Sequence, residues 1–88
     1  MKVILSNQAR KFLDRLYDKK QSEKLCQIID YLQIDPVPYK EYDLEKMGGM
    51  ESSYRLRKGD FRIVYSFNSE TNTVYVIEIT RREQAYRW

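Results

Sequence analysis

The stretch that decides the fold is Tyr54-Arg55-Leu56-Arg57-Lys58-Gly59-Asp60-Phe61-Arg62-Ile63-Val64-Tyr65. Apolar residues occupy every second position on both sides of Gly59-Asp60, which is the period of a β-strand. Glycine supplies the positive φ that a type I′ or II′ turn requires, so this pair predicts a two-residue hairpin turn. The sequence therefore predicts two antiparallel strands whose register is fixed by the turn.

That register places two arginines directly opposite each other. The four predicted cross-strand pairs are Lys58 with Phe61, Arg57 with Arg62, Leu56 with Ile63, and Arg55 with Val64. Like charges placed opposite at a β-carbon separation of about 5 Å destabilise a sheet. A bound polyanion would reverse the sign of that effect. We therefore interpret Arg57 and Arg62 as residues kept for binding phosphate.

Downstream, Asn68 to Asn72 predicts a second, looser hairpin leading into a strand over residues 73–80. Its apolar residues are expected on the buried side of the sheet: Tyr75, Ile77 and Ile79. Alternation then places Val76, Glu78, Thr80 and Arg82 on the opposite face, beside Arg55, Arg57 and Arg62. Tyr86 shares this face if the chain stays extended. The alternative is a solvated surface on which Glu78 and Glu83 pair with the arginines.

Upstream, the pattern is helical. Residues 2–5 predict a short strand, and Ser6 or Asn7 offers an N-cap for a helix. The helical spacing of the first segment is carried by Ala9, Phe12, Leu13 and Leu16, and that of a second helix by Leu25, Ile28, Ile29 and Leu32. A turn is predicted at Asp18-Lys19-Lys20, and Pro36 and Pro38 prevent the second helix from continuing. Residues 39–51, which contain Gly48-Gly49, are interpreted as a loop with at most a brief strand.

These elements predict an α+β fold, in which a helical hairpin packs on one face of a small, mainly antiparallel sheet in the order β-α-α-β-β-β. Eighty-eight residues are enough for a single domain, 1–88. No apolar run approaches the roughly 20 residues of a membrane span. The only cysteine, Cys26, cannot form an internal disulfide and is interpreted as a packing residue, which fits a cytoplasmic protein.

Charge is more informative in its distribution than in its total. The net charge is only +3, but seven of eight lysines precede residue 50 and six of eight arginines follow it. Arginine grips phosphate oxygens in pairs, whereas lysine commonly solubilises helix surfaces.

The missing residue types restrict the chemistry. The chain has no histidine, and its carboxylates and cysteine show no metal-ligand spacing, so we expect no metal and no cofactor. Clustered arginines can still catalyse phosphodiester cleavage by stabilising the charge that develops on the phosphate. RNA supplies its own nucleophile, the 2′-hydroxyl, which favours RNA over DNA as the substrate.

The hairpin stretch, together with the ending Thr80-Arg81-Arg82-Glu83-Gln84-Ala85-Tyr86-Arg87, resembles the RelE/ParE toxin superfamily. The order of the predicted elements also matches, so the resemblance spans essentially the whole chain. Arg82 and Tyr86 favour the RelE branch, whose members are toxins of type II toxin–antitoxin systems. The resemblance implies a ribosome-dependent endoribonuclease that cleaves mRNA in the ribosomal A site, inhibits translation and is neutralised by a RelB-like antitoxin.

The resemblance also implies roles for individual residues. The catalytic positions carried over are Arg57, Arg62, Arg82 and Tyr86, and the RNA-binding positions are Arg55, Lys58 and Arg81. Some relatives have a lysine general base at the position of Arg57. A guanidinium is a poor base, so Tyr86, Lys58 or Glu51 remain candidates for that role. Two alternatives remain: a ParE-like toxin that binds DNA gyrase, and an inactive regulator held by an antitoxin.

Overall fold

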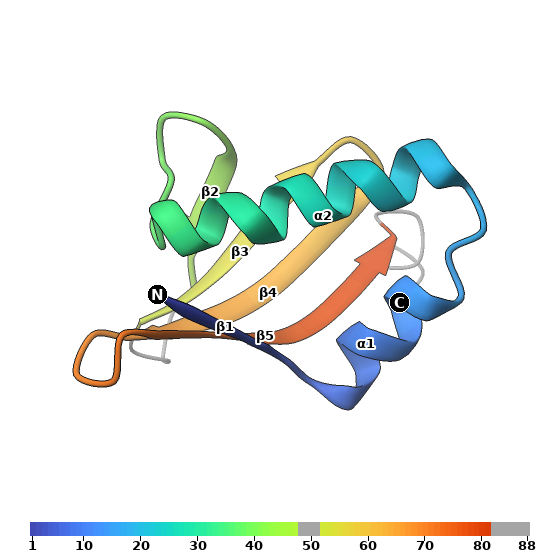
Figure 1. The fold of residues 1–88 in the computed structure, drawn as a ribbon. Helices are drawn as coiled ribbons and strands as arrows, with labels where there is room; N and C mark the ends of the chain where they lie inside the picture. Colours follow the sequence, from blue (N-terminus) through green and yellow to red (C-terminus); the bar gives the residue numbers. More distant parts are fainter. Residues whose placement is uncertain (48–51, 82–88) are drawn as a thin grey trace.

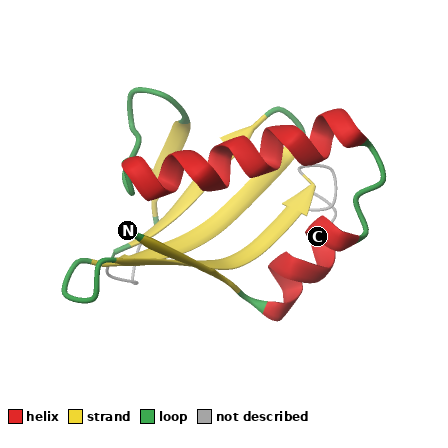
Figure 2. Ribbon diagram, viewed as in Figure 1, coloured by secondary structure: helices red, strands yellow, loops and turns green. Residues whose placement is uncertain are grey.

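Residues 1–47 and 52–81 are described in the computed structural model of the chain, and they form two helices and five strands. The elements in order are β1 (Lys2–Leu5), α1 (Asn7–Asp14), α2 (Lys19–Ile34), β2 (Asp43–Lys46), β3 (Ser53–Lys58), β4 (Phe61–Asn68) and β5 (Thr73–Arg81). Both helices lie on the same side of the sheet: α2 crosses its face (Figure 1), and α1 lies near the end of β5 (Figure 2). The predicted α+β architecture is confirmed.

The strands are ordered β1-β5-β4-β3-β2 across the sheet. β1 runs parallel to β5, and the other three neighbouring pairs are antiparallel. All four predicted cross-strand pairs of the β3–β4 hairpin are confirmed, including Arg57 opposite Arg62. Gly59 has a φ of 57°, the left-handed conformation expected of the turn glycine.

The predicted order of elements lacked one strand. Asp43–Lys46, in the segment interpreted as a loop with at most a brief strand, forms β2 and pairs antiparallel with β3 at the edge of the sheet. Its side chains alternate, because Tyr42 and Leu44 pack against the core while Asp43 and Glu45 are exposed. Four residues were too few for this alternation to stand out among polar neighbours. Gly48-Gly49 lies outside the described residues.

Each helix begins at a residue that caps it. The Ser6 side-chain oxygen accepts a hydrogen bond from the Ala9 amide, so Ser6 caps α1. Asp18 likewise accepts from the amides of Lys20 and Gln21, so Lys19 and Lys20 belong to α2 and the predicted turn is wrong at these two positions. α2 ends at Ile34, just before Pro36.

The core lies between the helices and the sheet. From α2 it takes Leu25, Ile28 and Leu32, whereas Ile29 is only partly buried. Cys26 is exposed, so its interpretation as a packing residue is wrong: it follows Leu25 directly and falls outside the buried stripe. Tyr65 is buried, which raises the pKa of its hydroxyl well above the usual tyrosine value, and the hydroxyl donates to the Pro36 carbonyl at 2.8 Å.

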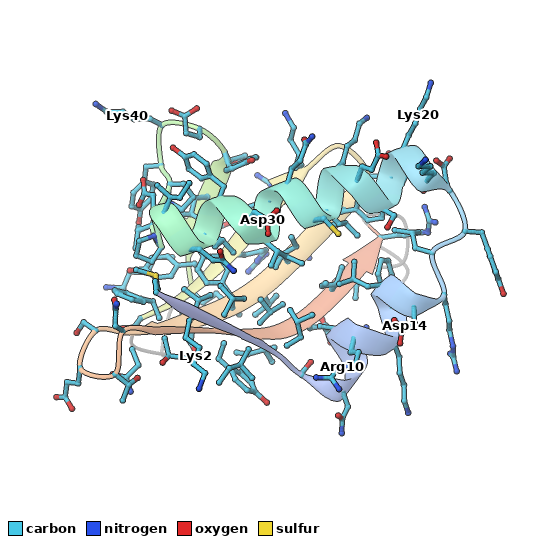
Figure 3. The ribbon with its side chains drawn as sticks, in the orientation of Figure 1. Lys2, Arg10, Asp14, Lys20, Asp30 and Lys40 are labelled. Atoms are coloured by element: carbon cyan, nitrogen blue, oxygen red, sulfur yellow. The ribbon has the colours of Figure 1, made fainter. Side chains whose placement is uncertain are left out.

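The charged side chains of the two helices are exposed. Lys20 at the start of α2 and Lys40 beyond its end extend away from the body of the molecule (Figure 3) and are exposed. Arg10 on α1 is exposed as well. Within residues 1–47 and 52–81, neither helix is long and apolar enough to cross a membrane.

β5 differs from the predicted alternation. Its buried residues are Val74, Val76 and Ile79, whereas Tyr75 is 43% exposed and Ile77 is half-buried. The cause is a register shift in the pairing of β4 with β5. Val64 faces Glu78, but the next residue of β4, Tyr65, faces Val76. Ile77 is passed over at this irregularity, so the parity of β5 reverses there. The predicted burial is therefore right for Ile79, wrong for Tyr75 and only partly right for the half-buried Ile77. Val76, predicted on the opposite face, is buried in the core.

Ser6, which caps α1, and Gln8, in the first turn of α1, continue the pairing of β1 with β5. The Ser6 amide donates to the Val76 carbonyl at 2.9 Å, and the Ser6 hydroxyl donates to the Ile77 carbonyl. The Gln8 side-chain amide both donates to the Ile79 carbonyl and accepts from the Ile79 amide, each at 2.8 Å. Gln8 thus replaces a neighbouring strand at the last part of β5.

We expect Gln8→Ala to lower the free energy of unfolding by about 1–2 kcal/mol, because both backbone groups of Ile79 lose their partner. Urea denaturation measures this effect. Gln27→Ala is the matched control, since Gln27 is an exposed glutamine of α2. Equal stability of the two variants would show that water replaces the Gln8 amide without cost.

Candidate nucleic-acid interface

Three arginines lie on the sheet face that points away from the helices. Arg55 and Arg57 flank the buried Leu56 on β3, and Arg62 lies between the buried Phe61 and Ile63 on β4. Because successive side chains of a strand point to opposite faces, all three arginines share the uncovered face. We call Arg55, Arg57 and Arg62 the arginine face.

The centre of the arginine face is the pair predicted from the hairpin. Arg57 and Arg62 lie directly opposite each other on β3 and β4, which are both interior strands of the sheet. Each is half-buried, and the Nε atom of Arg62 is buried. Two guanidinium groups held on rigid neighbouring strands provide a suitable site for a phosphate group, because each can donate two parallel hydrogen bonds.

The structure adds carboxylates that sequence reasoning missed. β2 places Asp43 opposite Arg57 and Glu45 opposite Arg55. Glu78, which the sequence already placed on this face, lies on β5 opposite Val64. A nitrogen of the Arg57 guanidinium lies 3.0 Å from a carboxylate oxygen of Asp43. The arginine face is therefore less basic than predicted. The alternation of Tyr42-Asp43-Leu44-Glu45 was the signal that could have revealed these two carboxylates.

Two predicted RNA-binding residues do not join the arginine face. Arg81 pairs across the sheet with the buried Phe61, and its guanidinium lies 5.5 Å from the centre of the Phe61 ring. It also donates to the Gln21 side chain of α2 at 3.4 Å, so it lies on the helical side of the sheet. Lys58 is exposed at the end of β3 and has the parity of Leu56 rather than of Arg57.

Arg82, Tyr86, Glu51 and Glu83 lie outside the described residues. The predicted positions that the structure brings together are therefore Arg55, Arg57 and Arg62. Thr80, which faces Arg62 from β5, lies beside these three arginines as predicted.

A polar pocket and two exposed tyrosines lie away from the arginine face. A polar pocket of about 470 Å³ lies at the far end of β3 and β4 from Arg57 and Arg62, and its lining includes Ser52, Ser66 and Asn68. On the helical side, Tyr17 is 96% exposed and Tyr39 is 58% exposed. Tyr31 and Tyr42 pack edge to face at 5.7 Å, and burial is the main cause that raises the pKa of Tyr31.

Comparison with known proteins is consistent with this architecture. The profile of the family described as "ParE toxin of type II toxin-antitoxin system, parDE" matches residues 3–86. A relative from Methanocaldococcus jannaschii, named "Putative toxin RelE1", is 31% identical over 65 residues, which cover 74% of this chain and 72% of the relative.

Solved structures extend the likeness to the fold. The archaeal RelE–RelB complex from Pyrococcus horikoshii contains a chain that is 29% identical, with a TM-score of 0.82 and coverage of 92% of this chain and 93% of that one. The intact RelBE toxin–antitoxin complex of E. coli contains a chain with the same fold at 23% identity, with a TM-score of 0.72 and coverage of 91% and 94%. The chain thus belongs to the RelE/ParE superfamily, in its RelE-like branch, and is a toxin of the type II toxin–antitoxin class.

Proposed function

We propose that this toxin is a metal-independent endoribonuclease that cleaves mRNA in the ribosomal A site and thereby stops translation. The observation that carries the proposal is the placement of Arg57 opposite Arg62 on two interior strands. This arrangement costs stability in the free protein and is favourable when a phosphate lies between the two guanidinium groups.

In the proposed reaction, the 2′-oxygen of a ribose attacks the adjacent phosphorus and the bond from phosphorus to the 5′-oxygen breaks. The products are a 2′,3′-cyclic phosphate and a free 5′-hydroxyl. Arg57 and Arg62 stabilise the negative charge that develops on the phosphate oxygens. Arg55, two residues before Arg57 on the same face, binds a neighbouring phosphate of the strand.

Arg82 and Tyr86 complete the proposed catalytic set, and proton transfer is assigned to residues other than the arginines. A guanidinium stays protonated at every physiological pH, so it cannot accept the 2′-hydroxyl proton. Tyr86 and Glu51 stay candidates for the base, whereas Lys58 is less suited because it has the parity of Leu56 rather than of Arg57. Tyr65 is excluded from this role, because it faces the core and its raised pKa keeps the hydroxyl protonated.

We further propose that a RelB-like antitoxin neutralises the toxin, as the complexes formed by its structural relatives suggest. Tyr17 and Tyr39 are suitable anchors, since large exposed aromatic side chains dominate the energetics of interfaces. Tyr31 and Tyr42 are half-buried against each other and contribute a smaller surface.

The decisive experiment adds the purified toxin to ribosomes that are translating a defined mRNA and maps the new 5′ ends by primer extension. We expect cuts within the codon in the A site, and none when the same mRNA is incubated without ribosomes. The same preparation is assayed against DNA gyrase, since the matching family profile is named for the ParE toxin. Intact mRNA together with inhibited gyrase would replace the ribonuclease assignment by the ParE-like one.

A further inference from the structure

The ion pair between Arg57 and Asp43 occupies part of the proposed phosphate site. The shortest contact joins one terminal nitrogen of the guanidinium to one carboxylate oxygen at 3.0 Å. The two residues face each other across β3 and β2, and Arg62 faces Arg57 from the other side, on β4. One transverse row of the sheet thus reads Asp43, Arg57, Arg62 and Thr80.

The place of Asp43 in this row offsets the repulsion between the arginines. Asp43 lies on the edge strand β2, so its carboxylate draws the Arg57 guanidinium away from Arg62. It supplies to Arg57 the type of ligand, an anionic oxygen, that an RNA phosphate would supply.

The pair is also accessible enough to be exchanged. The Asp43 side chain is 60% exposed and that of Arg57 is 32% exposed. Water and salt weaken ion pairs at such positions, so little is lost when one breaks. A phosphate can accept two parallel hydrogen bonds from a guanidinium and can contact Arg62 at the same time, whereas Asp43 lies two strands away from Arg62.

We propose that Asp43 is a placeholder for the RNA phosphate: it holds Arg57 in the free toxin and is exchanged for the phosphate when RNA binds. Asp43 therefore lowers the affinity of the site for anions and limits binding to RNA that can displace it. The identity of the anion as RNA rests on the proposed function, whereas the exchange itself concerns only Arg57, Asp43 and a phosphate group.

The test is a titration of the folded toxin with inorganic phosphate, followed by the NMR signal of the Arg57 side-chain Nε–H. We expect Asp43→Asn to lower the apparent dissociation constant about three- to five-fold, because the competing carboxylate is gone. Glu45→Gln is the matched control: it removes the same charge from the same strand and face, one row away and opposite Arg55. We expect Glu45→Gln to change the apparent dissociation constant by less than about 1.5-fold, because water and salt screen the interaction between exposed charges.

A double-mutant cycle separates exchange at Arg57 from a general change in charge. For this cycle, phosphate binding is read from the Arg62 Nε–H signal in Arg57→Ala and in Arg57→Ala with Asp43→Asn. We expect affinities that differ by less than about 1.5-fold in these two proteins, because Asp43 then has no Arg57 to occupy and only a screened charge effect remains. An Asp43→Asn effect that persists without Arg57, or that equals the effect of Glu45→Gln, overturns the placeholder. Weaker phosphate binding in Asp43→Asn, or no phosphate binding at Arg57, also overturns it.

This result is independent of the ribosome assay. A toxin that shows the expected phosphate exchange but leaves mRNA intact retains the placeholder and loses the proposed activity. A toxin that cleaves mRNA but shows no exchange retains the activity and loses the placeholder.

Discussion

Arg62→Ala is expected to reduce the rate of ribosome-dependent mRNA cleavage by a factor on the order of 10²–10³. Arg62 lies at the centre of the arginine face, on an interior strand, with its Nε buried and Arg57 opposite. Its guanidinium is thus held in place before substrate binds, which makes charge stabilisation effective. Arg82→Ala is expected to have an effect of the same order. The measurement is the single-turnover cleavage rate on stalled ribosomes at saturating toxin.

The fold should survive the loss of Arg62. Phe61 and Ile63, which contribute to the core, are unchanged, and removing Arg62 relieves its repulsion with Arg57. Circular dichroism and the thermal unfolding midpoint check this point. Arg10→Ala, which removes an exposed arginine from α1, is the control and should cleave at the wild-type rate. If Arg62→Ala unfolds the protein, Arg62→Lys is measured in its place, because lysine keeps the positive charge. Full cleavage activity of Arg62→Lys would contradict a need for the guanidinium.

Expression of the toxin alone is expected to arrest growth, and co-expression of the cognate antitoxin should restore it. The physical reason is that a catalyst of mRNA cleavage acts many times per molecule, so few free toxin molecules are needed. The antitoxin gene is sought next to the toxin gene, as a short reading frame for an acidic, helix-rich protein. Colony counts after induction measure the arrest, and co-purification measures the complex.

The binding surface can be tested in the same system. Tyr17→Ala together with Tyr39→Ala should weaken the complex while the toxin stays active, because both side chains are exposed on the helical side, away from the arginine face. Tyr75→Ala is the matched control, an exposed tyrosine on the sheet. Harmless toxin at high expression, with undisturbed translation, would contradict both the toxic activity and the need for an antitoxin.

The hairpin was predictable because its information is local. Gly59 fixes the turn, the turn fixes the register, and the register alone places Arg57 opposite Arg62. The helices were predictable from their apolar spacing, and their ends from Ser6 and the prolines. These features depend on residues that are close together in the sequence.

The errors arose where distant strands decide the outcome. The irregularity at Ile77 depends on how β5 pairs with β4, and alternation within β5 alone cannot reveal it. β2 is a strand because β3 lies beside it, so the pairing of Asp43 with Arg57 is not visible in the local pattern. The position of Arg81 over Phe61, on the helical side, is likewise set by the pairing of β4 with β5, whereas its RNA-binding role was implied only by the family resemblance.

The parallel pairing of β1 with β5 has a consequence for the biosynthesis of the toxin. Residues 2–5 acquire their partners only when residues 73–76 are available, and Gln8 must wait for Ile79, 71 positions later. Contacts of such long sequence separation are slow to form, because closing the long stretch of chain between them costs entropy. A nascent chain that has not yet exposed β5 from the ribosome therefore cannot complete the sheet, and β4, which carries Arg62, lacks one of its two neighbours. The strand pairs on both sides of Arg62 are therefore complete only after almost all of the described sequence has been synthesised.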